Sequence, residues 1–565
     1  MLPMRNGFSV LGSAGVRCLV VSLGLASTAV GCSSALDVPL KPDSVGSDAG
    51  AGIDMGADLA APPDLAPPPD LTPPPDLNPG FDATPAIRRT ADWMGIIGTG
   101  QSLSVGAAGN PLISTVQPFQ NMKLLDPDYT GDLLGAAPMS AKLAPLVEPI
   151  RGYNNKFPGG PGYPNNIYGE TPHSAMANQL SALSQAIENR DYITIHSAIG
   201  ESGQSITVIK KNGSGNSYAA ALYEARAIAR IAAGAQKTFA YGALTLTHGE
   251  TDWNDANYEA DIRQLFLDYN KDLPVITGQK TMIPLIVSQQ GTFPNQPGSA
   301  PSTLAEWRLG LDYPGEILCS GPKYQYEYSN DKVHLTANGY RRMGEKYAQV
   351  YEQAVMRGAT WKPLQPRQAK RAGAVITLDF DVPVAPLSWD DHLAPPHQSL
   401  NKQWSKGRGF EVINLNGALT ISSVALTGAS QVTITLDQPP AAGGIVVSYA
   451  MTQDVGGFTG GTNDARQGQL RDSDATVGYD LETIPVTVTA GSAVVTSTGI
   501  ADFSRRSIRD VVRTVGFPPG TVIVSRSANN QATLSAPWGG ASGNALLAVA
   551  NDLHNYAVQF AIAVP

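Results

Sequence analysis

The chain has 565 residues, of which 42% are hydrophobic, so it can bury a large core and is not wholly disordered. Its net charge of −9 is concentrated in residues 32–87, which hold nine Asp and one Lys, whereas the first 31 residues carry only Arg5 and Arg17. About −3 is therefore left for the rest of the chain, which lacks the basic field of a nucleic-acid-binding protein and is long enough for two or three domains.

Residues 1–31 have the pattern of an export signal. Arg5 and Arg17 precede an apolar run over residues 18–26, which is shorter than the ~20 residues of a membrane span. The small residues before Cys32 resemble the lipobox of bacterial lipoproteins. This resemblance implies cleavage before Cys32, a diacylglycerol on its sulfur, and a protein anchored by lipid to the cell envelope, at the outer membrane or cell surface. The alternative is an ordinary cleaved signal in which Cys32 is incidental.

Residues 32–88 are expected to form an extended tether. Pro-Pro-Asp-Leu occurs at residues 62–65, 68–71 and 74–77. Proline fixes φ and removes hydrogen-bond donors, and the spaced Asp residues keep the segment solvated, so we expect a polyproline-like stalk. A proline motif that binds another protein is the alternative. Beyond the tether Cys319 is the one remaining cysteine, which excludes an internal disulfide framework.

Residues 89–366 alternate short apolar strands with longer helical stretches. Strands are expected at residues 93–97, 192–195, 239–246 and 282–287. Helices are expected at residues 173–190, 218–233, 257–269 and 336–356. This alternation predicts a parallel sheet covered by helices on both faces, with the chemistry at the carboxyl ends of the strands.

Residues 367–565 change to a β pattern. Apolar runs rich in β-branched residues, separated by Gly, Pro, Asn and Asp, lie at residues 374–380, 410–413, 419–426, 432–436 and 445–449. They predict an all-β sandwich or jelly-roll. A final strand is expected at 555–560. The interval of about 483–549 has its own Val- and Thr-rich runs, which predicts a small β module inserted into the sandwich.

Two motifs near predicted strand or helix ends carry residues suited to nucleophilic catalysis. Gly98-Thr99-Gly100-Gln101-Ser102 follows the first strand, and glycines beside a serine at such a corner expose the hydroxyl. It is not a dinucleotide-binding loop, because Leu103 stands where that motif needs its third glycine. Asp331-Lys332-Val333-His334 precedes the last helix, where an imidazole can take a proton from a serine and a carboxylate can orient it. Taken alone, the second motif also fits an acidic helix cap beside a half-buried histidine.

A third motif, His248-Gly249-Glu250-Thr251-Asp252, follows a middle strand and completes a pattern. Gly-Gln-Ser, Gly-Glu-x-Asp and Asp-x-x-His in this order resemble the SGNH (GDSL-like) hydrolases, and more narrowly their sialate O-acetylesterase and acetylxylan-esterase-like branch. The resemblance covers about residues 92–364. It implies a three-layer α/β/α SGNH-hydrolase fold, ahead of the all-β sandwich, and a serine-esterase mechanism without metal or cofactor. It also implies an acetylated poly- or oligosaccharide substrate.

The resemblance assigns roles to individual residues. Ser102 matches the nucleophile, His334 the general base and acid, and Asp331 its orienting carboxylate. The oxyanion hole would use the N–H of Ser102, the N–H of a glycine after the second strand, and a side-chain donor. Gly203 is the preferred glycine and Gly200 the alternative.

The side-chain donor position is occupied by His248, where the family usually has glutamine. Gln101, Glu250 and Asp252 are expected to hold the surrounding loops rather than to react. Trp253, beside the third motif, would either stack on a sugar ring or simply pack.

Two other functions compete with the esterase. A metal hydrolase would gather His248, Glu250, Asp252 and His334 around one ion. A catalytically inactive surface protein would bind polysaccharide, with Trp389 and Trp404 as stacking platforms. In each case we expect a monomer that does not bind nucleic acid.

Overall fold

The computed structural model describes residues 87–125, 139–150, 169–291, 301–393, 404–441, 444–451, 468–479, 482–499 and 502–565. The predicted signal, Cys32 and nearly all of the predicted tether therefore lie outside the described residues. Within these ranges, no helix combines the length and apolarity that crossing a membrane requires.

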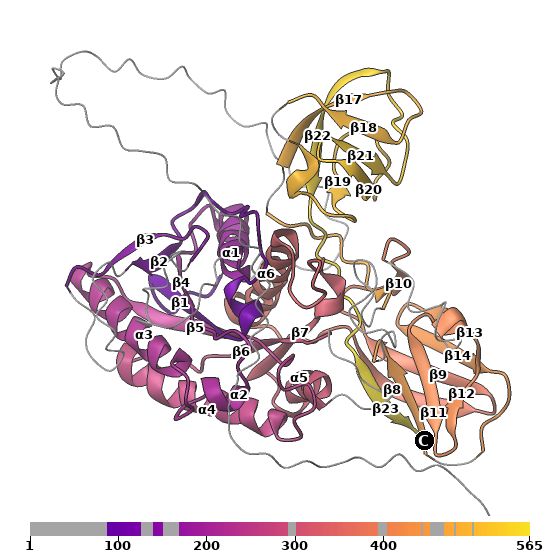
Figure 1. The fold of residues 1–565 in the computed structure, drawn as a ribbon, viewed down its shortest axis with the longest axis horizontal. Coiled ribbons are helices and arrows are strands. Elements are labelled where there is room, and N and C mark those ends of the chain that lie inside the picture. The colour runs from indigo at the N-terminus through magenta and orange to yellow at the C-terminus, as the bar shows by residue number, and fades with distance from the viewer. Residues whose placement is uncertain are drawn as a thin grey trace, which may run out of the picture. The chain divides into compact units, whose positions relative to one another are not determined.

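A seven-stranded sheet with the spatial order β3-β2-β4-β1-β5-β6-β7 organises the first half of the described chain (Figure 1). Its strands are β1 Trp93–Gly100, β2 Met122–Leu125, β3 Lys142–Pro145, β4 Thr194–Ala198, β5 Phe239–Thr247, β6 Leu285–Gln289 and β7 Ile317–Pro322. All neighbours are parallel except β2 and β3, which pair antiparallel. The predicted parallel sheet thus gains an antiparallel strand at its edge, a common variation in α/β sheets.

Helices cover both faces of this sheet. They are α1 Pro172–Glu188, α2 Ile206–Ile209, α3 Ser217–Gly234, α4 Tyr258–Thr277, α5 Pro301–Asp312 and α6 Ala337–Tyr351. Ile96 and Ile286 belong to a buried cluster with α1 and α6, whereas the neighbouring Ile97 and Leu285 belong to a cluster with α3, α4 and α5. Because successive strand residues point to opposite faces, the arrangement has three layers.

Helix α6 has a defined start, which matters because it follows His334. The Thr336 side chain accepts a hydrogen bond from the N–H of Gly339 at 3.1 Å and so caps the helix. The helix is shorter than the predicted 336–356, because Glu352–Met356 form a π-helical turn.

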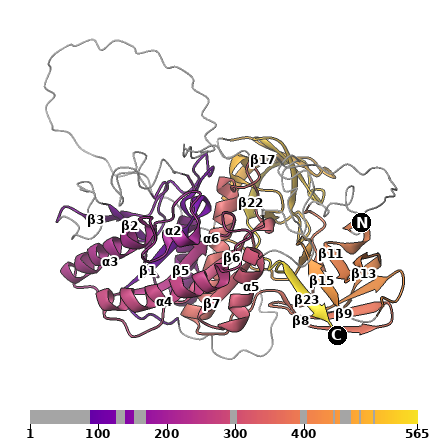
Figure 2. The same ribbon diagram turned by 60° about the horizontal axis from the view of Figure 1, so that its bottom comes forward.

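The chain after α6 is largely β structure. One four-stranded sheet has the order β13-β14-β9-β8 and another has the order β12-β11-β15-β23. The bounds are β8 Gln365–Ala372, β9 Val375–Asp381, β11 Phe410–Asn414, β12 Gly417–Leu419, β13 Ile421–Gly428, β14 Gln431–Leu436, β15 Ile445–Tyr449 and β23 Phe560–Val564. Phe380 of β9 meets Phe560 of β23 edge to face, so the two sheets pack on a shared core. Figures 1 and 2 both place β23 beside β8.

The expected final strand at 555–560 is wrong by about five residues, since β23 begins at Phe560. Main-chain groups just before it bond partly to Leu470 and Arg471, where Tyr556 forms an isolated bridge with Arg471, and partly to the α/β region. The N–H of Gln559 donates to Oε1 of Gln289 at 2.8 Å, and Nε2 of Gln289 donates to the carbonyl of Gln559 at 2.8 Å. The segment therefore has the apolar pattern of a strand but forms only an isolated bridge.

A six-stranded sheet with the order β19-β22-β17-β18-β21-β20 lies in sequence between β16 and β23. Its strands are β17 Glu482–Val488, β18 Val494–Ser497, β19 Val511–Val512, β20 Ile523–Ala528, β21 Gln531–Leu534 and β22 Gly543–Ala550. The short strands β10 Ser388–Trp389 and β16 Leu470–Arg471 pair with each other. The sheet has a buried cluster of its own, which includes Ile484, Phe503 and Leu547. We refer to residues 482–550 as the β module; the domain limits at 366 and 367 stay a prediction.

Candidate active site

Ser102 lies at the carboxyl end of β1, as expected for the first motif. The strand ends at Gly100, and Ser102 opens a 3-10 helix that runs from Ser102 to Val105. Gly100 has φ of +135°, and a Cβ there would lie 2.1 Å from the carbonyl oxygen of Thr247 on β5. Only glycine permits this turn, so the backbone itself fixes where the Ser102 hydroxyl stands.

The second motif lies on a tight loop between the 3-10 helix η2, Lys323–Gln325, and α6. The N–H of Ser329 donates to the carbonyl of His334 at 2.7 Å, and the N–H of Thr336 donates to the carbonyl of Glu327 at 3.0 Å. Lys332 takes φ of +61°, which reverses the chain between the two functional side chains. This loop brings Asp331 and His334 to the same point.

Ser102, His334 and Asp331 form one hydrogen-bonded chain. Nε2 of His334 lies 2.7 Å from Oγ of Ser102, and Nδ1 of His334 lies 2.6 Å from Oδ2 of Asp331. The other carboxylate oxygen accepts the N–H groups of Val333 and His334, each at 2.9 Å. The loop therefore holds the carboxylate from two sides.

The charge of Asp331 decides which atoms of this series of hydrogen bonds carry the protons. Burial alone would raise the pKa of Asp331, but hydrogen bonds from the side chain and backbone of His334 bring that pKa well below its ordinary value. Because a carboxylate can only accept, Nδ1 of His334 carries the hydrogen and Nε2 is left as the acceptor for the Ser102 hydroxyl. That is the tautomer a general base requires.

The loop after β4 runs beside the end of β1. The N–H of Ile199 donates to the carbonyl of Gly98 and that of Glu201 to the carbonyl of Gly100, both at 2.9 Å. A Cβ on Gly200 would lie 1.9 Å from Oγ of Ser104, so Gly200 is required for close packing. Gly203 is exposed at the loop, with φ of +68° and open space where a Cβ would stand.

Two backbone donors of this region are unused. Neither the N–H of Ser102 nor that of Gly203 donates to another group among the residues that the structure describes. Gly203, the preferred glycine of the sequence analysis, is thus the one with a spare donor, whereas Gly200 serves the packing.

His248 differs from its expected role. Burial lowers its pKa to about 3, so the ring is neutral and has one N–H. Nε2 lies 3.0 Å from the carbonyl oxygen of Gln204, which can only accept, so Nε2 carries that hydrogen. Nδ1 then accepts from the Tyr258 hydroxyl at 2.9 Å. In this conformation the ring has no further hydrogen to donate to an oxyanion, and it holds the residue next to Gly203 instead.

A buried carboxyl group completes this arrangement. Oε1 of Glu306 lies 3.4 Å from the Tyr258 hydroxyl, and Oε2 accepts the N–H of Gln290 at 2.6 Å. Burial raises the pKa of Glu306 well above its ordinary value, although Lys323 opposes the shift. Glu306, Tyr258, His248 and Gln204 thus form a continuous series of buried contacts.

The other residues of the third motif bind neighbouring loops. Oε1 of Glu250 accepts from Nζ of the fully buried Lys323 at 2.5 Å. Oδ2 of Asp252 accepts the N–H of Ile206 at 2.6 Å, and Oε1 of Gln101 accepts the N–H of Thr251 at 3.2 Å. These contacts join the first and third motifs to the loop that carries Gly203.

Sequence reasoning missed Lys323, Glu306 and Tyr258. Lys323 directly follows the apolar run of β7 and Glu306 lies on the apolar face of α5, two elements that were not predicted. A charged residue within an apolar periodicity was the available signal for both.

The alternative metal site is not assembled. In the described ranges, no group of three or more His, Cys, Asp or Glu side chains is placed to hold a metal ion. His334 contacts Ser102 whereas His248 contacts Tyr258, so the proposed ligands do not converge.

The tryptophans singled out from the sequence occupy different settings. Trp253 lies in the loop after β5 and is 38% exposed. Trp389 is half-buried beneath the guanidinium of Arg408, which lies 4.8 Å from the ring centre. Trp404 begins the short helix Trp404–Gly407, but its side chain lies outside the description.

Comparison with known proteins gave structural likenesses alone. No protein-family model matches the chain, and no curated protein matches it. A carbohydrate acetylesterase from Xanthomonas citri matches with 13% identity over 68% of this chain and 81% of its own, at a TM-score of 0.42. NanS matches with 13% identity over 48% and 98%, and a protein from Arabidopsis thaliana with 15% identity over 47% and 99%, both at a TM-score of 0.33. Because each TM-score is below 0.5, the function is inferred from the geometry of this chain.

Proposed function

We propose that the chain is a serine esterase that removes O-acetyl groups from carbohydrate by way of an acyl-enzyme. The observation that carries the proposal is the hydrogen-bonded chain from Ser102 through His334 to Asp331, with contacts of 2.7 and 2.6 Å. A hydroxyl, a base and an orienting carboxylate in this order are the parts that acyl transfer needs.

In the first half-reaction Oγ of Ser102 attacks the ester carbonyl while Nε2 of His334 takes the hydroxyl proton. The carbonyl π electrons move to its oxygen, which becomes the oxyanion of a tetrahedral intermediate. When this intermediate collapses, the bond to the sugar oxygen breaks and Nε2 of His334 gives its proton to that oxygen. Asp331 keeps Nδ1 protonated throughout and stabilises the imidazolium that forms.

The unused N–H groups of Ser102 and Gly203 are the proposed donors to the oxyanion. Backbone donors that stand ready before the reaction need no reorganisation when the charge develops. His248 enters this scheme as a positioning residue, because its Nε2–H holds Gln204 beside Gly203.

In the second half-reaction water replaces the sugar alcohol. His334 takes a proton from the water as it attacks the acetyl-enzyme, and returns that proton to Oγ of Ser102 as acetate leaves. The acetyl and carbohydrate parts of the proposal depend on the resemblance of the three motifs to sialate O-acetylesterases and acetylxylan esterases. Trp253 follows Asp252 in the chain and is exposed, so we propose its ring as a surface on which a sugar can stack.

Labelling with a fluorophosphonate probe tests the proposal, because such a probe reacts only with an activated serine. We expect the wild type to gain one adduct by intact mass, and Ser102→Ala to gain none. Ser202→Ala is the matched control, since Ser202 is exposed on the neighbouring loop and outside the chain of contacts. Failure of the wild type to react would overturn the proposal and leave the polysaccharide-binding alternative.

The substrate is tested separately. Acetate release from acetylated xylan oligosaccharides and from O-acetylated sialic acid would be followed for wild type and Ser102→Ala. Loss of release in the variant assigns the activity to Ser102. If the probe labels the wild type but neither substrate releases acetate, the proposal of a serine esterase stands and the proposed substrate class is wrong.

We also propose that the mature protein is held at the cell envelope by lipid on Cys32. The support is the charged start, the short apolar run and the small residues before Cys32. Metabolic labelling with a fatty-acid probe should mark the wild type but not Cys32→Ala. Equal labelling of the two proteins would contradict the anchor.

A further inference from the structure

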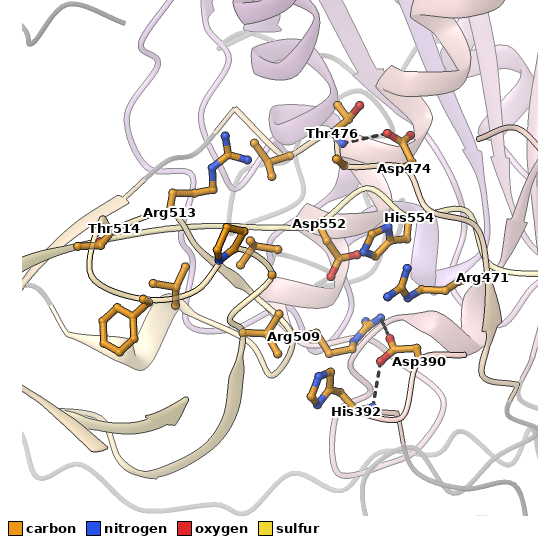
Figure 3. Close-up of a pocket in the computed structure, with 18 of the residues that line it drawn as sticks. Asp390, His392, Arg471, Asp474, Thr476, Arg509, Arg513, Thr514, Asp552 and His554 are labelled. Carbon is orange, nitrogen blue, oxygen red and sulfur yellow. Dashed lines mark hydrogen bonds and ion pairs between the residues drawn. The ribbon is translucent and has the colours of Figure 1, made fainter. Parts of the chain in front are cut away.

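A cavity of about 580 Å³ lies away from Ser102, between the β module and the segments that lead into and out of it (Figure 3). One wall is formed by residues of the module, among them Arg513 and Thr514. Asp390, Arg471 and His554 belong to the opposite wall. The volume is in the range of small-molecule binding sites and fits one or two sugar rings.

The module wall is largely apolar. Its apolar members are Val511, Val512, Val515, Phe517, Pro519 and Val522. Phe517 is fixed from behind by Trp538, with ring centres 5.0 Å apart. Such a wall suits the C–H face of a pyranose ring.

The carboxylates of the cavity already have partners within the protein. Oδ2 of Asp390 accepts from Nη1 of Arg509 at 3.4 Å. Asp474 accepts from Nε2 of Gln349 at 2.6 Å and from the N–H of Thr476 at 2.9 Å.

Asp552 accepts from Nη1 of Arg342 at 3.5 Å, and the nearby cations Arg342 and Arg509 also lower its pKa against the effect of burial. The carboxylates that line the cavity therefore already accept hydrogen bonds from, or pair with, other groups of the protein.

Several donors of the cavity are not committed. The guanidinium of Arg513 makes no hydrogen bond or ion pair with any described residue. Arg471 uses Nη1 on the carbonyl of Asp472 at 2.7 Å, but its buried Nε has no described partner. Nδ1 of His554, which donates or accepts according to the tautomer of the ring, also has no described partner. Figure 3 shows Arg471 and His554 side by side across the cavity from Arg513.

We propose that this cavity binds an acidic sugar of the uronic acid type, with its carboxylate at Arg513 and its ring against the apolar wall. The uncommitted donors need hydrogen-bond acceptors, and the unpaired guanidinium needs a negative charge. A carboxylate supplies both. A neutral sugar carries a hydroxymethyl group in place of the carboxylate, and so offers no charge to these cations. The inference does not depend on the esterase activity.

Binding would be measured on the full chain carrying Ser102→Ala, so that no ester chemistry intervenes. The probes are methyl β-D-glucuronoside, methyl β-D-glucoside and acetate, followed by ligand-observed NMR titration. We expect the glucuronoside to bind, the glucoside to bind at least tenfold more weakly, and acetate not to displace the glucuronoside at equal concentration.

Arg513→Ala on the same background should weaken glucuronoside binding about tenfold, because one charge-assisted contact is lost. Arg505→Ala is the matched control: it removes the same charge from an exposed position of the same module, away from the cavity. Glucuronoside binding that is unchanged in Arg513→Ala, or weakened equally by Arg505→Ala, would overturn the proposal.

Equal binding of the glucoside, or displacement by acetate, would also overturn it. Fluorophosphonate labelling of the otherwise wild-type chain should be the same with and without Arg513→Ala. A failure of this proposal is thereby distinguishable from a failure of the esterase.

Discussion

Arg509 of the β module donates through Nη2 to the main-chain carbonyl oxygen of Gln325, at 2.5 Å, and its side chain is buried. Gln325 ends the short helix η2, six residues before Asp331. Arg509 also lies within 3.4 Å of Asp390, so one guanidinium joins the module, the sandwich and the approach to the proposed catalytic loop. The β module is therefore part of the framework around His334.

Glu327 makes a second connection of this kind. Its Oε2 accepts from Oγ1 of Thr336 at 3.2 Å and from Oγ of Ser507 at 3.1 Å. Thr336 caps α6 two residues after His334, whereas Ser507 belongs to the module. One carboxylate thus fixes both the end of the loop that carries His334 and its distance from the module.

Glu327→Ala should lower kcat roughly tenfold and leave KM little changed, because the loop that carries His334 loses a support while the substrate surface does not. The rate of fluorophosphonate labelling should fall in parallel, and Glu327→Gln, which keeps an acceptor oxygen, should recover most of it. Glu316→Ala, which removes a surface carboxylate paired with Arg263, is the control and should change neither rate. An unaltered kcat in Glu327→Ala would contradict the positioning role.

Asp331→Asn should lower kcat by about 10⁴ while the protein stays folded. The asparagine oxygen can still accept the N–H groups of Val333 and His334, so the loop keeps its shape. Its amide N–H₂ would face Nδ1 of His334 and favour the tautomer with hydrogen on Nε2, which cannot accept the Ser102 proton. Steady-state hydrolysis of p-nitrophenyl acetate measures the effect. A loss of less than about tenfold would mean that Asp331 does not set the tautomer.

His248→Phe should lower kcat by roughly 10² and leave Ser102 intact, since the carbonyl of Gln204 loses its donor and Gly203 loses its neighbour's support. His248→Gln should retain activity within about tenfold, because a side-chain amide can donate to the same carbonyl. Burial holds the pKa of His248 at about 3, so His248 should not titrate near pH 6.5. The pH dependence of kcat should therefore have the same shape near pH 6.5 in the wild type and in His248→Gln. A step near pH 6.5 in the wild type that disappears in the variant would refute this placement of His248.

The three residues that are hydrogen-bonded to one another at the site could be predicted from the sequence, because each lies in a short motif next to the end of a helix or strand. Ser102, Asp331 and His334 lie in such motifs, whereas the choice of Gly203 over Gly200 as an oxyanion donor depends on a resemblance and stays a prediction. A loop of a few residues has few ways to present a hydroxyl or an imidazole, so local sequence carries most of the information.

The contacts that support the site could not be predicted from the sequence in this way. Lys323 meets Glu250 from 73 positions away and Ser507 meets Glu327 from 180 positions away, so no local pattern joins them. The segment before β23 has the apolar pattern of a strand, but its backbone bonds to Gln289 of the other region. The cavity beside Arg513 likewise arises from segments more than a hundred residues apart, such as those of Asp390 and Arg513.

Asp252→Asn should stabilise the protein increasingly as the pH rises from about 4 to about 6.5. Burial raises the pKa of Asp252 from 3.8 to about 6 in the folded state, so between these values the folded state binds more protons than the unfolded one. Stability of the wild type therefore falls as the pH rises through this window, whereas asparagine keeps an acceptor for the N–H of Ile206 and has no proton to lose. Thermal unfolding of both proteins from pH 3.5 to 7.5 measures the difference in Tm. If the difference in Tm stays constant or reverses sign with rising pH, then burial beside the Gly203 loop does not raise the pKa of Asp252.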